Sequence, residues 1–183
     1  MVTPALEQRI LSEIIQPTIL GMAAEGRAYS GFLYAGLMIT ESGDPWVLEF
    51  NVRLGDPETQ AIMMRLQSDL VELCQAVFDH RLDAHTLTWD PCSALGVVLS
   101  APGYPVATCT GAPIQGLDGV ASDVQVFHAG TAQKGTEIVT AGGRVLCVTA
   151  LGTDLESARR AVYASVDAIH WEGMYYRTDI GAS

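Results

Sequence analysis

The spacing of apolar residues changes near residue 92, and this change limits the fold more than any other feature of the sequence. Before it, apolar residues recur at the three- and four-residue intervals of amphipathic helices, with one alternating segment among them. After it, short apolar runs alternate with turns rich in glycine and proline, which is typical of small β structure. The pattern therefore predicts an α+β chain in two parts, residues 1–81 and residues 82–183.

Local signals place the individual elements. The segments 34–40 and 46–51 read as strands, and the turn residues between them predict a hairpin. Further strands are predicted at 95–99, 124–127, 137–140 and 145–151. Predicted helix starts share a polar residue that satisfies free N–H groups: Thr3, Asp56, Ser68 and Thr153, the last with Glu156 in a capping box. Pro17 is expected to kink or end the first helix, because it lacks an N–H group and clashes one turn back.

Composition and charge exclude several classes of protein. A hydrophobic content of 49% with 17% charged residues suits a packed core and not a disordered chain. The formal net charge of -11 argues against nucleic acid or an anionic membrane as a partner, because such partners require lysine and arginine. No apolar run approaches the roughly 20 residues that span a bilayer. The four cysteines show no metal or redox spacing, which is typical of a reducing, cytoplasmic setting.

The segment Glu49 to Gln60, with the sequence EFNVRLGDPETQ, contains the candidate metal-binding and catalytic residues. Side chains alternate along a strand, so Trp46, Leu48 and Phe50 are expected to face the core. Glu49 and Asn51 then share the other face, with two oxygen donors about 7 Å apart. Such donors hold Mg²⁺ together with substrate phosphates.

Arg53 joins the same face as Glu49 and Asn51 if the strand continues, where its guanidinium would offset charge on a transferring phosphoryl group. Each of these residues also has a plainer interpretation. Alternating polar residues often mark a solvated sheet face. Asp56 before a proline is a good helix N-cap, and Glu58 favours the helix dipole in any case.

The sequence resembles the phosphoribosylamine–glycine ligases (glycinamide ribonucleotide synthetases), enzymes of purine synthesis with an ATP-grasp fold. Besides EFNVRLGDPETQ, the matching segments in chain order are LYAGLMIT, SDLVELC, VFHAGT, GGRVLCVTALG and YRTDIG. The resemblance covers essentially the whole chain. It implies that residues 1–81 are a C-terminal slice of the ATP-grasp domain. Residues 82–183 then form the small β-rich C-terminal domain, which is similar to the corresponding biotin-carboxylase-like domain (rudiment hybrid).

The resemblance also implies a reaction: ATP, glycine and 5-phosphoribosylamine give glycinamide ribonucleotide, ADP and phosphate through glycyl phosphate. It makes Glu49 and Asn51 ligands of Mg²⁺ or Mn²⁺ at the ATP phosphates, and puts Arg53 at the transferring phosphoryl group as the catalytic residue. Asp56 and Glu58 belong to the loop that receives the substrates. Members of this family are much longer, so we expect a fragment that is inactive alone and that needs the missing N-terminal part. Lys134, the only lysine, agrees with phosphate-binding lysines lying elsewhere.

Two alternatives stay open at this point. Carboxylases of the biotin type share an E-x-N-x-R segment, so another ATP-grasp ligase fits that motif equally well. The second alternative is not an enzyme: the chain could be a non-catalytic oligomerisation module. His128 and Arg144 lie beside glycine turns, where a structural role is the simpler interpretation of each; for Arg144 that role is at the edge of a hairpin turn, and a contact with an anion is the alternative.

Overall fold

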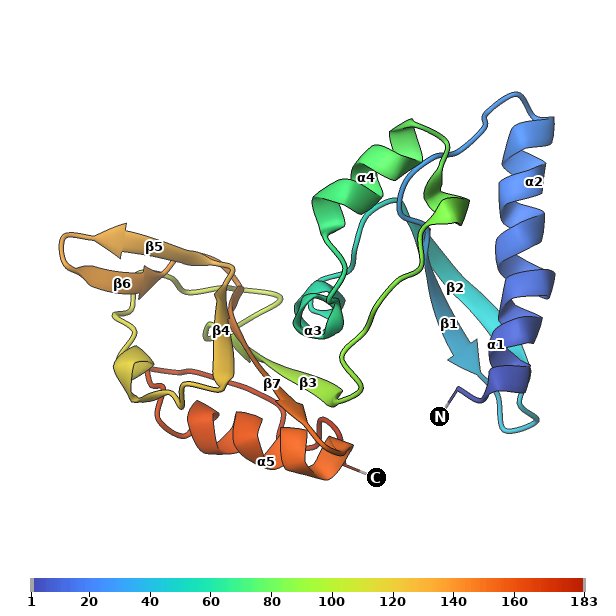
Figure 1. Ribbon diagram of the computed structural model, residues 1–183. Coiled ribbons are helices and arrows are strands. Elements are labelled where there is room, and N and C mark those ends of the chain that lie inside the picture. Colours follow the sequence, from blue (N-terminus) through green and yellow to red (C-terminus); the bar gives the residue numbers. More distant parts are fainter. Residues whose placement is uncertain (1, 183) are drawn as a thin grey trace. The chain divides into compact units, whose positions relative to one another are not determined.

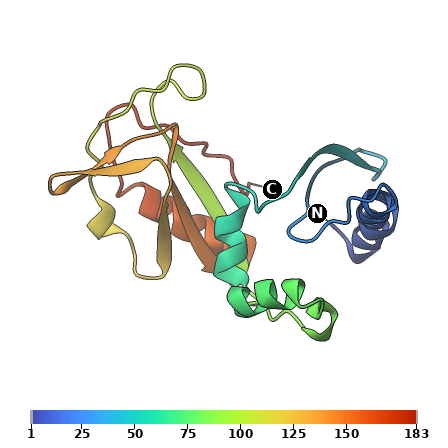
Figure 2. The ribbon, with the colours of Figure 1, turned by 90° about the horizontal axis from the view of Figure 1, so that it is seen from above.

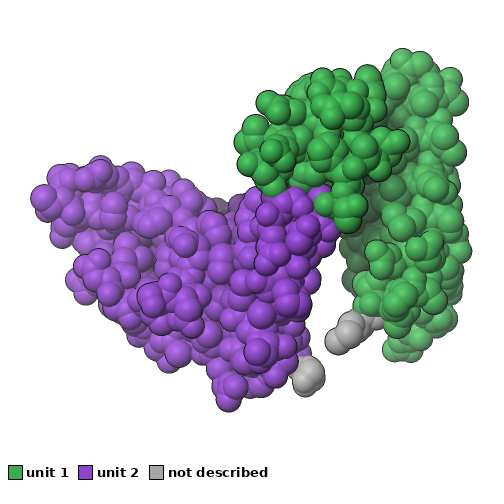
Figure 3. All heavy atoms as spheres, in the orientation of Figure 1, with its two compact units in different colours: residues 1–55, 69–86 green, residues 56–68, 87–183 purple. Residues whose placement is uncertain are grey.

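The structure is a computed structural model that describes residues 2–182 and divides into two compact units. Unit 1 comprises residues 1–55 and 69–86, and unit 2 comprises residues 56–68 and 87–183 (Figure 3). Helices and sheets occur in both units, which confirms the α+β class. The predicted domain boundary at residues 81 and 82 stays a prediction. Between residues 2 and 182, no helix has the length and apolar character needed to cross a membrane.

Unit 1 begins with a run of helix in three parts. The helix α1 (Pro4–Ile10) is followed by a π-helical segment (Leu11–Ile15) and by α2 (Gln16–Ala24). Figure 2 looks nearly along this run, and Figure 1 shows it from the side. The side-chain oxygen of Thr3 accepts a hydrogen bond from the N–H of Leu6 at 3.3 Å, which confirms the predicted N-cap.

Of the two outcomes expected at Pro17, a kink or an end of the helix, the structure excludes the end, because α2 continues through this residue. The N–H of Gln16 donates to the carbonyl of Leu11, five residues back, so the irregular π segment comes directly before the proline. The Thr18 hydroxyl donates to the carbonyl of Ile14 at 2.7 Å. The chain therefore stays helical because a local change in hydrogen bonding and a side-chain donor accommodate the residue that lacks an N–H group.

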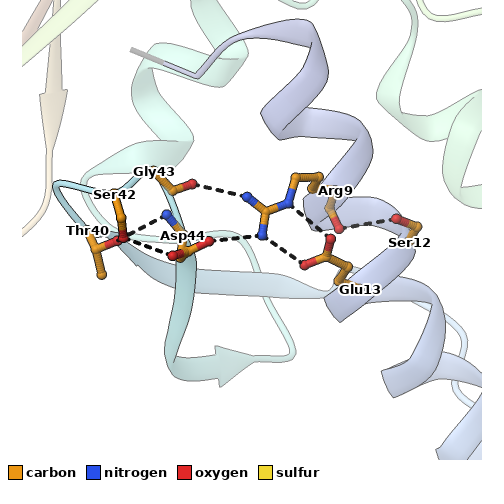
Figure 4. A network of polar contacts seen from close by, with 7 residues as sticks. All are labelled: Arg9, Ser12, Glu13, Thr40, Ser42, Gly43 and Asp44. Atoms are coloured by element: carbon orange, nitrogen blue, oxygen red, sulfur yellow. Dashed lines mark hydrogen bonds and ion pairs between the residues drawn. The ribbon is translucent and has the colours of Figure 1, made fainter.

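The predicted hairpin is confirmed. Strand β1 (Tyr34–Ile39) pairs with β2 (Pro45–Asn51) in an antiparallel sheet of two strands. The Arg9 guanidinium on α1 donates to the Asp44 carboxylate at 3.2 Å and to the carbonyl of Gly43 at 3.4 Å (Figure 4). The hairpin turn is thereby tied to the first helix.

The helix α4 (Leu70–Phe78) completes unit 1 together with a short 3-10 helix (Leu82–Ala84). The expectation that Ser68 caps α4 is wrong by one residue. Asp69 is the N-cap, and its carboxylate accepts the N–H of Val71 at 2.7 Å. Ser68 is the last residue of the first segment of unit 2, and its hydroxyl accepts the N–H of Thr88 in the same unit at 2.8 Å. Because the two polar residues are adjacent, either has the right chemistry, and the backbone path decides between them.

Three large apolar side chains of β2 are exposed, contrary to the prediction that they face a core. Trp46 and Leu48 are each 66% exposed and Phe50 is 41% exposed. Among the described residues of unit 1, Ala76 is the only buried hydrophobic residue. The shared face is also wrong: the register step at Leu48 places Trp46, opposite Met38, and Phe50, opposite Ala35, on different sides of the hairpin.

Unit 2 is built on a sheet with the strand order β3-β7-β4 (Figure 1). Its strands are β3 (Ser93–Ser100), β7 (Arg144–Gly152) and β4 (Val124–His128), and a separate hairpin joins β5 (Thr131–Lys134) to β6 (Glu137–Thr140). The helices α5 (Leu155–Val166) and α3 (Glu58–Arg65) both contact β3 and β7, and a 3-10 helix spans Leu117–Gly119. The four strands predicted here are confirmed, whereas β5 was not predicted.

The core of the described chain lies in unit 2. Leu99, Val145, Val148 and Val162 are completely buried between β3, β7 and α5. The cap of α5 differs by one residue from the prediction: Asp154, not Thr153, is the N-cap, and it forms the capping box with Ser157, not with Glu156. Hydrogen bonds from Ser157, first from its backbone N–H, lower the pKa of the Asp154 carboxyl.

Unequal burial predicts unequal mutational costs. Leu99→Ala removes a completely buried side chain and should lower the free energy of unfolding by about 2–5 kcal/mol. Leu48→Ala, at a side chain that is 66% exposed, should change it by no more than about 0.5 kcal/mol. Urea unfolding of both variants measures the difference. A cost at Leu48 as large as that at Leu99 would contradict the exposure of Leu48.

The turn of the hairpin supports a prediction about pH. A hydrogen bond from Ser42, followed by the one from Arg9, lowers the pKa of the Asp44 carboxyl. The stability that Asp44 contributes is therefore present above the unfolded pKa of about 3.9 and is lost as the pH falls through its folded pKa. NMR titration should show that Ser42→Ala and Arg9→Ala each raise this pKa. An unchanged value in both variants would contradict the network.

Candidate functional site

Glu49 and Asn51 lie side by side on β2. The amide nitrogen of Asn51 donates to the Glu49 carboxylate at 3.0 Å. Glu49 is exposed and Asn51 is partly buried, so neither polar group is enclosed by apolar side chains. The contact is of the kind that the two-residue period of a strand predicts for residues i and i+2.

A β-bulge precedes this pair. The register steps from Gly36 opposite Glu49 to Leu37 opposite Val47, so Leu48 is the extra residue. Strict alternation is broken there, but Glu49 and Asn51 both follow the bulge and keep their shared face. Gly36 also leaves room for the acid, because a Cβ at that position would lie 3.0 Å from the Cγ of Glu49.

The donor chemistry of the pair fits a hard divalent cation. With its nitrogen turned to Glu49, the Asn51 amide keeps its oxygen available as a ligand beside the carboxylate. Among residues 2–182, no group of three or more His, Cys, Asp or Glu could hold a metal ion. Two oxygen ligands alone suit Mg²⁺ or Mn²⁺ that takes its remaining ligands from water and substrate phosphates.

Arg53 does not reach this face by continuation of the strand. The strand β2 ends at Asn51 and the chain bends at residues 52 and 53, so the condition for that prediction is not met. The exposed Arg53 guanidinium donates to the carbonyl of the next residue, Leu54, at 3.2 Å.

Asp56 forms an ion pair and does not cap a helix. Its carboxylate accepts Nε of Arg144 at 3.2 Å and Nη2 at 3.0 Å, and it accepts the Gln60 amide at 3.3 Å. The N-cap of α3 is Pro57, without a side-chain cap bond, so the capping prediction is wrong. The cis peptide bond between Asp56 and Pro57 accompanies this arrangement. Glu58 lies in the first turn of α3, as predicted.

Arg144 forms an ion pair with Asp56 and is not part of a hairpin turn. The strands on either side of Gly142 and Gly143, β6 and β7, belong to different sheets, so the turn interpretation is wrong. Besides its bonds to Asp56, Arg144 donates to the Tyr104 hydroxyl at 3.0 Å. Asp56 raises the pKa of the Arg144 guanidinium above its ordinary value, chiefly through their hydrogen bonds.

A cavity of about 370 Å³ lies beside this ion pair, entirely within unit 2. Tyr104, Arg144, Tyr175 and Arg177 are among its lining residues. No spacing pattern in the sequence indicated Tyr104, Tyr175 or Arg177 as site residues, although Arg177 lies in the YRTDIG segment that contributed to the resemblance. A basic residue inside a matched segment was the signal that could have indicated it.

The predicted site residues thus form two separate groups. Glu49 and Asn51, with Arg53 shortly after them, lie in unit 1, whereas Asp56 and Glu58 lie in unit 2. His128 is not part of either group: its ring contacts the hydroxyl of Thr131 at 3.1 Å at the end of β4.

Two family models match the chain. The ATP-grasp (A) domain of phosphoribosylglycinamide synthetase matches residues 1–59, and the C domain of the same enzyme matches residues 94–183. The chain belongs to the phosphoribosylglycinamide synthetase family. The recognition made from the sequence segments is thereby confirmed, and so is the fold class with an ATP-grasp portion followed by the family's C-terminal domain.

Individual relatives agree with the family. The chain is 54% identical to the phosphoribosylamine–glycine ligase of Vibrio vulnificus (strain YJ016) over 182 residues, which are 99% of this chain and 42% of that protein. The crystal structure of the phosphoribosylamine–glycine ligase of Thermotoga maritima is 38% identical, with a TM-score of 0.80 over 98% of this chain and 44% of that one. This chain therefore spans less than half the length of these relatives.

A more distant structure shares the fold. The biotin carboxylase domain of the Hydrogenobacter thermophilus 2-oxoglutarate carboxylase is 18% identical, with a TM-score of 0.59 over 95% of this chain and 38% of that one. At this identity the likeness concerns the fold alone.

The contact between Gly143 and Tyr104 supports a prediction about the ion pair. A Cβ at Gly143 would lie 2.2 Å from the Tyr104 ring, so Gly143→Ala must displace the ring that bonds Arg144. Unfolding in urea should show a loss of about 1–3 kcal/mol. The control is Gly21→Ala, where nothing lies within 4 Å; it should be neutral or stabilising by up to about 1 kcal/mol, because alanine favours a helix. Equal effects in both variants would contradict the close packing.

Proposed function

We propose that this chain is part of an ATP-dependent ligase that joins glycine to 5-phosphoribosylamine, with release of ADP and phosphate. The observation that carries the proposal is the Glu49 and Asn51 pair, held at 3.0 Å on an exposed strand face of a chain from this family. The chain spans 42% of the length of the Vibrio vulnificus ligase, so the activity is assigned to this chain together with the remaining portion of such an enzyme.

The proposed reaction brings two anions together. The glycine carboxylate attacks the γ-phosphate of ATP, and the amine of phosphoribosylamine then displaces phosphate from glycyl phosphate. Cationic groups must offset this repulsion. When bound, Mg²⁺ or Mn²⁺ would supply positive charge at the phosphates, and Glu49 and Asn51 are the residues proposed to hold it.

The other residues have proposed roles in positioning charge. Arg53 is proposed to stabilise the transferring phosphoryl group, because a guanidinium binds phosphate oxygens through directed N–H groups. Its donation to the Leu54 carbonyl leaves most of its donors available. Asp56 and Glu58 are proposed to contribute to the substrate loop, and the ion pair of Asp56 with Arg144 supports a fixed position for that carboxylate.

The carboxylase and the non-catalytic module are less well supported than the glycine ligase. A carboxylase shares the fold at 18% identity, whereas the ligase family matches both ends of the chain. A non-catalytic module has no need of a carboxylate and an amide kept together on an exposed strand. Bicarbonate-dependent ATP turnover would favour the carboxylase over the glycine ligase.

A chimeric enzyme tests the proposal. The matching segment of the Vibrio vulnificus ligase is replaced by this chain, and ADP release is followed with glycine and phosphoribosylamine. Turnover should appear in the chimera and be absent from this chain alone. Glu49→Ala or Asn51→Ala in the chimera should lower turnover by at least about 100-fold and weaken Mn²⁺ binding, because each removes an oxygen donor.

The matched control is Glu41→Ala, which removes an exposed carboxylate from the preceding turn. This variant should keep the turnover and the Mn²⁺ affinity of the unmodified chimera. Unchanged turnover in both the Glu49 and the Asn51 variants would refute the metal assignment. Turnover that requires bicarbonate in place of glycine would refute the ligase assignment.

A further inference from the structure

The cavity of about 370 Å³ in unit 2 is lined by basic side chains, although the chain as a whole is acidic. The whole sequence has a formal net charge of -11 and ten basic residues. Within the described residues, both charged side chains on the cavity wall, Arg144 and Arg177, are arginines. A concave wall with two guanidinium groups in an acidic protein favours an anionic ligand.

Both guanidinium groups are oriented and still have N–H groups to donate. Arg144 uses Nε and Nη2 for Asp56 and Nη1 for Tyr104, and each terminal nitrogen carries a second hydrogen. Arg177 donates Nε and Nη2 to the Asp179 carboxylate at 2.9 and 2.6 Å, which leaves Nη1. These carboxylates hold the planar groups in place, and planar guanidinium groups match phosphate oxygens.

Hydrogen bonds from α5 hold the segment that contains Arg177. Arg159 donates to the carbonyls of Thr178 at 3.1 Å and Ile180 at 3.3 Å. The Tyr163 hydroxyl donates to the carbonyl of Arg177 at 2.8 Å and accepts the N–H of Ile180 at 3.2 Å. A ligand that contacts this segment therefore meets an ordered wall, which lowers the entropic cost of binding.

The rest of the wall is apolar, aromatic or backbone. Tyr104 and Tyr175 line it, and β3 is an edge strand of its sheet. On the open edge of β3, the described pairing is the bridge between Ser100 and Tyr175, so backbone groups beyond it border the cavity. Such a wall suits a sugar ring, and the arginines suit its phosphate.

We infer that this cavity binds the phosphate monoester of the ribosyl substrate, with the phosphate at Arg144 and Arg177 and the sugar between the tyrosines and the β3 edge. The choice of ligand rests on the proposed function, which requires a 5-phosphoribosyl compound. The volume of about 370 Å³ admits a pentose phosphate and falls in the lower range of small-molecule sites.

Binding to the full chain tests the inference without ATP or metal. The probe is ribose 5-phosphate, compared with ribose and with inorganic phosphate, by calorimetry and by NMR of backbone amides. Ribose 5-phosphate should bind more tightly than either, and should shift the amides of Val98, Ser100 and Tyr175. Arg177→Ala should weaken its binding by about tenfold or more, and Arg177→Lys should weaken it less.

The matched control is Arg160→Ala, at an exposed arginine on α5 that does not line the cavity; it should bind within about twofold of the unmodified chain. Circular dichroism checks that each variant is folded, and the Lys variant serves if the Ala variant is not. Equal binding by the Arg177 and Arg160 variants, equal binding of inorganic phosphate and ribose 5-phosphate, or no binding would overturn the inference. Each of these results leaves the test at Glu49 in the chimera unaffected, so the two proposals fail separately.

Discussion

The hydrogen bond between the Asn51 amide and the Glu49 carboxylate is the interaction on which the functional interpretation depends. It requires both residues to follow the bulge at Leu48, because a bulge between them would turn one side chain to the other face. Gly36 opposite Glu49 leaves space for the acid, because a Cβ there would lie 3.0 Å from the Cγ of Glu49. The strand thereby presents a carboxylate with an amide oxygen beside it, which is a partial set of ligands that a nucleotide phosphate can complete.

The two units differ in how they bury apolar surface. Unit 2 has a sheet of three strands packed on α5 and contains nearly all of the buried core. Unit 1 has a hairpin and helices, with large apolar side chains such as Trp46 and Leu48 exposed. An isolated pair of strands is marginally stable in water, so the stability of this chain should come mainly from unit 2. The proposed metal ligands therefore lie on the less buried of the two units.

Much of the fold could be predicted from the sequence, because strand and helix periods are local properties. The strands were placed within one or two residues, but Ser68 and Thr153 were chosen as caps next to Asp69 and Asp154, which do the capping. Adjacent polar residues have the same chemistry, and only the backbone path separates them.

Contacts distant in the sequence could not be predicted in this way. Asp56 lies 88 residues before Arg144, and no spacing rule links them. The shared face of Glu49 and Asn51 followed from the period of a strand, whereas the exposure of Phe50 depends on what covers the sheet. Family resemblance indicated the segments that contain Asp56, Arg144 and Arg177, but the structure was needed to show the ion pair and the cavity.

Paramagnetic NMR of this chain with Mn²⁺ measures the central claim most directly. Mn²⁺ bound at the pair broadens the resonances of nearby protons, so the side-chain amide of Asn51 and the backbone amide of Glu49 should disappear at the lowest metal concentrations. Signals from Glu41 in the preceding turn should persist there. If the Asn51 side-chain amide stays sharp while acidic residues elsewhere broaden first, Glu49 and Asn51 are not the metal ligands.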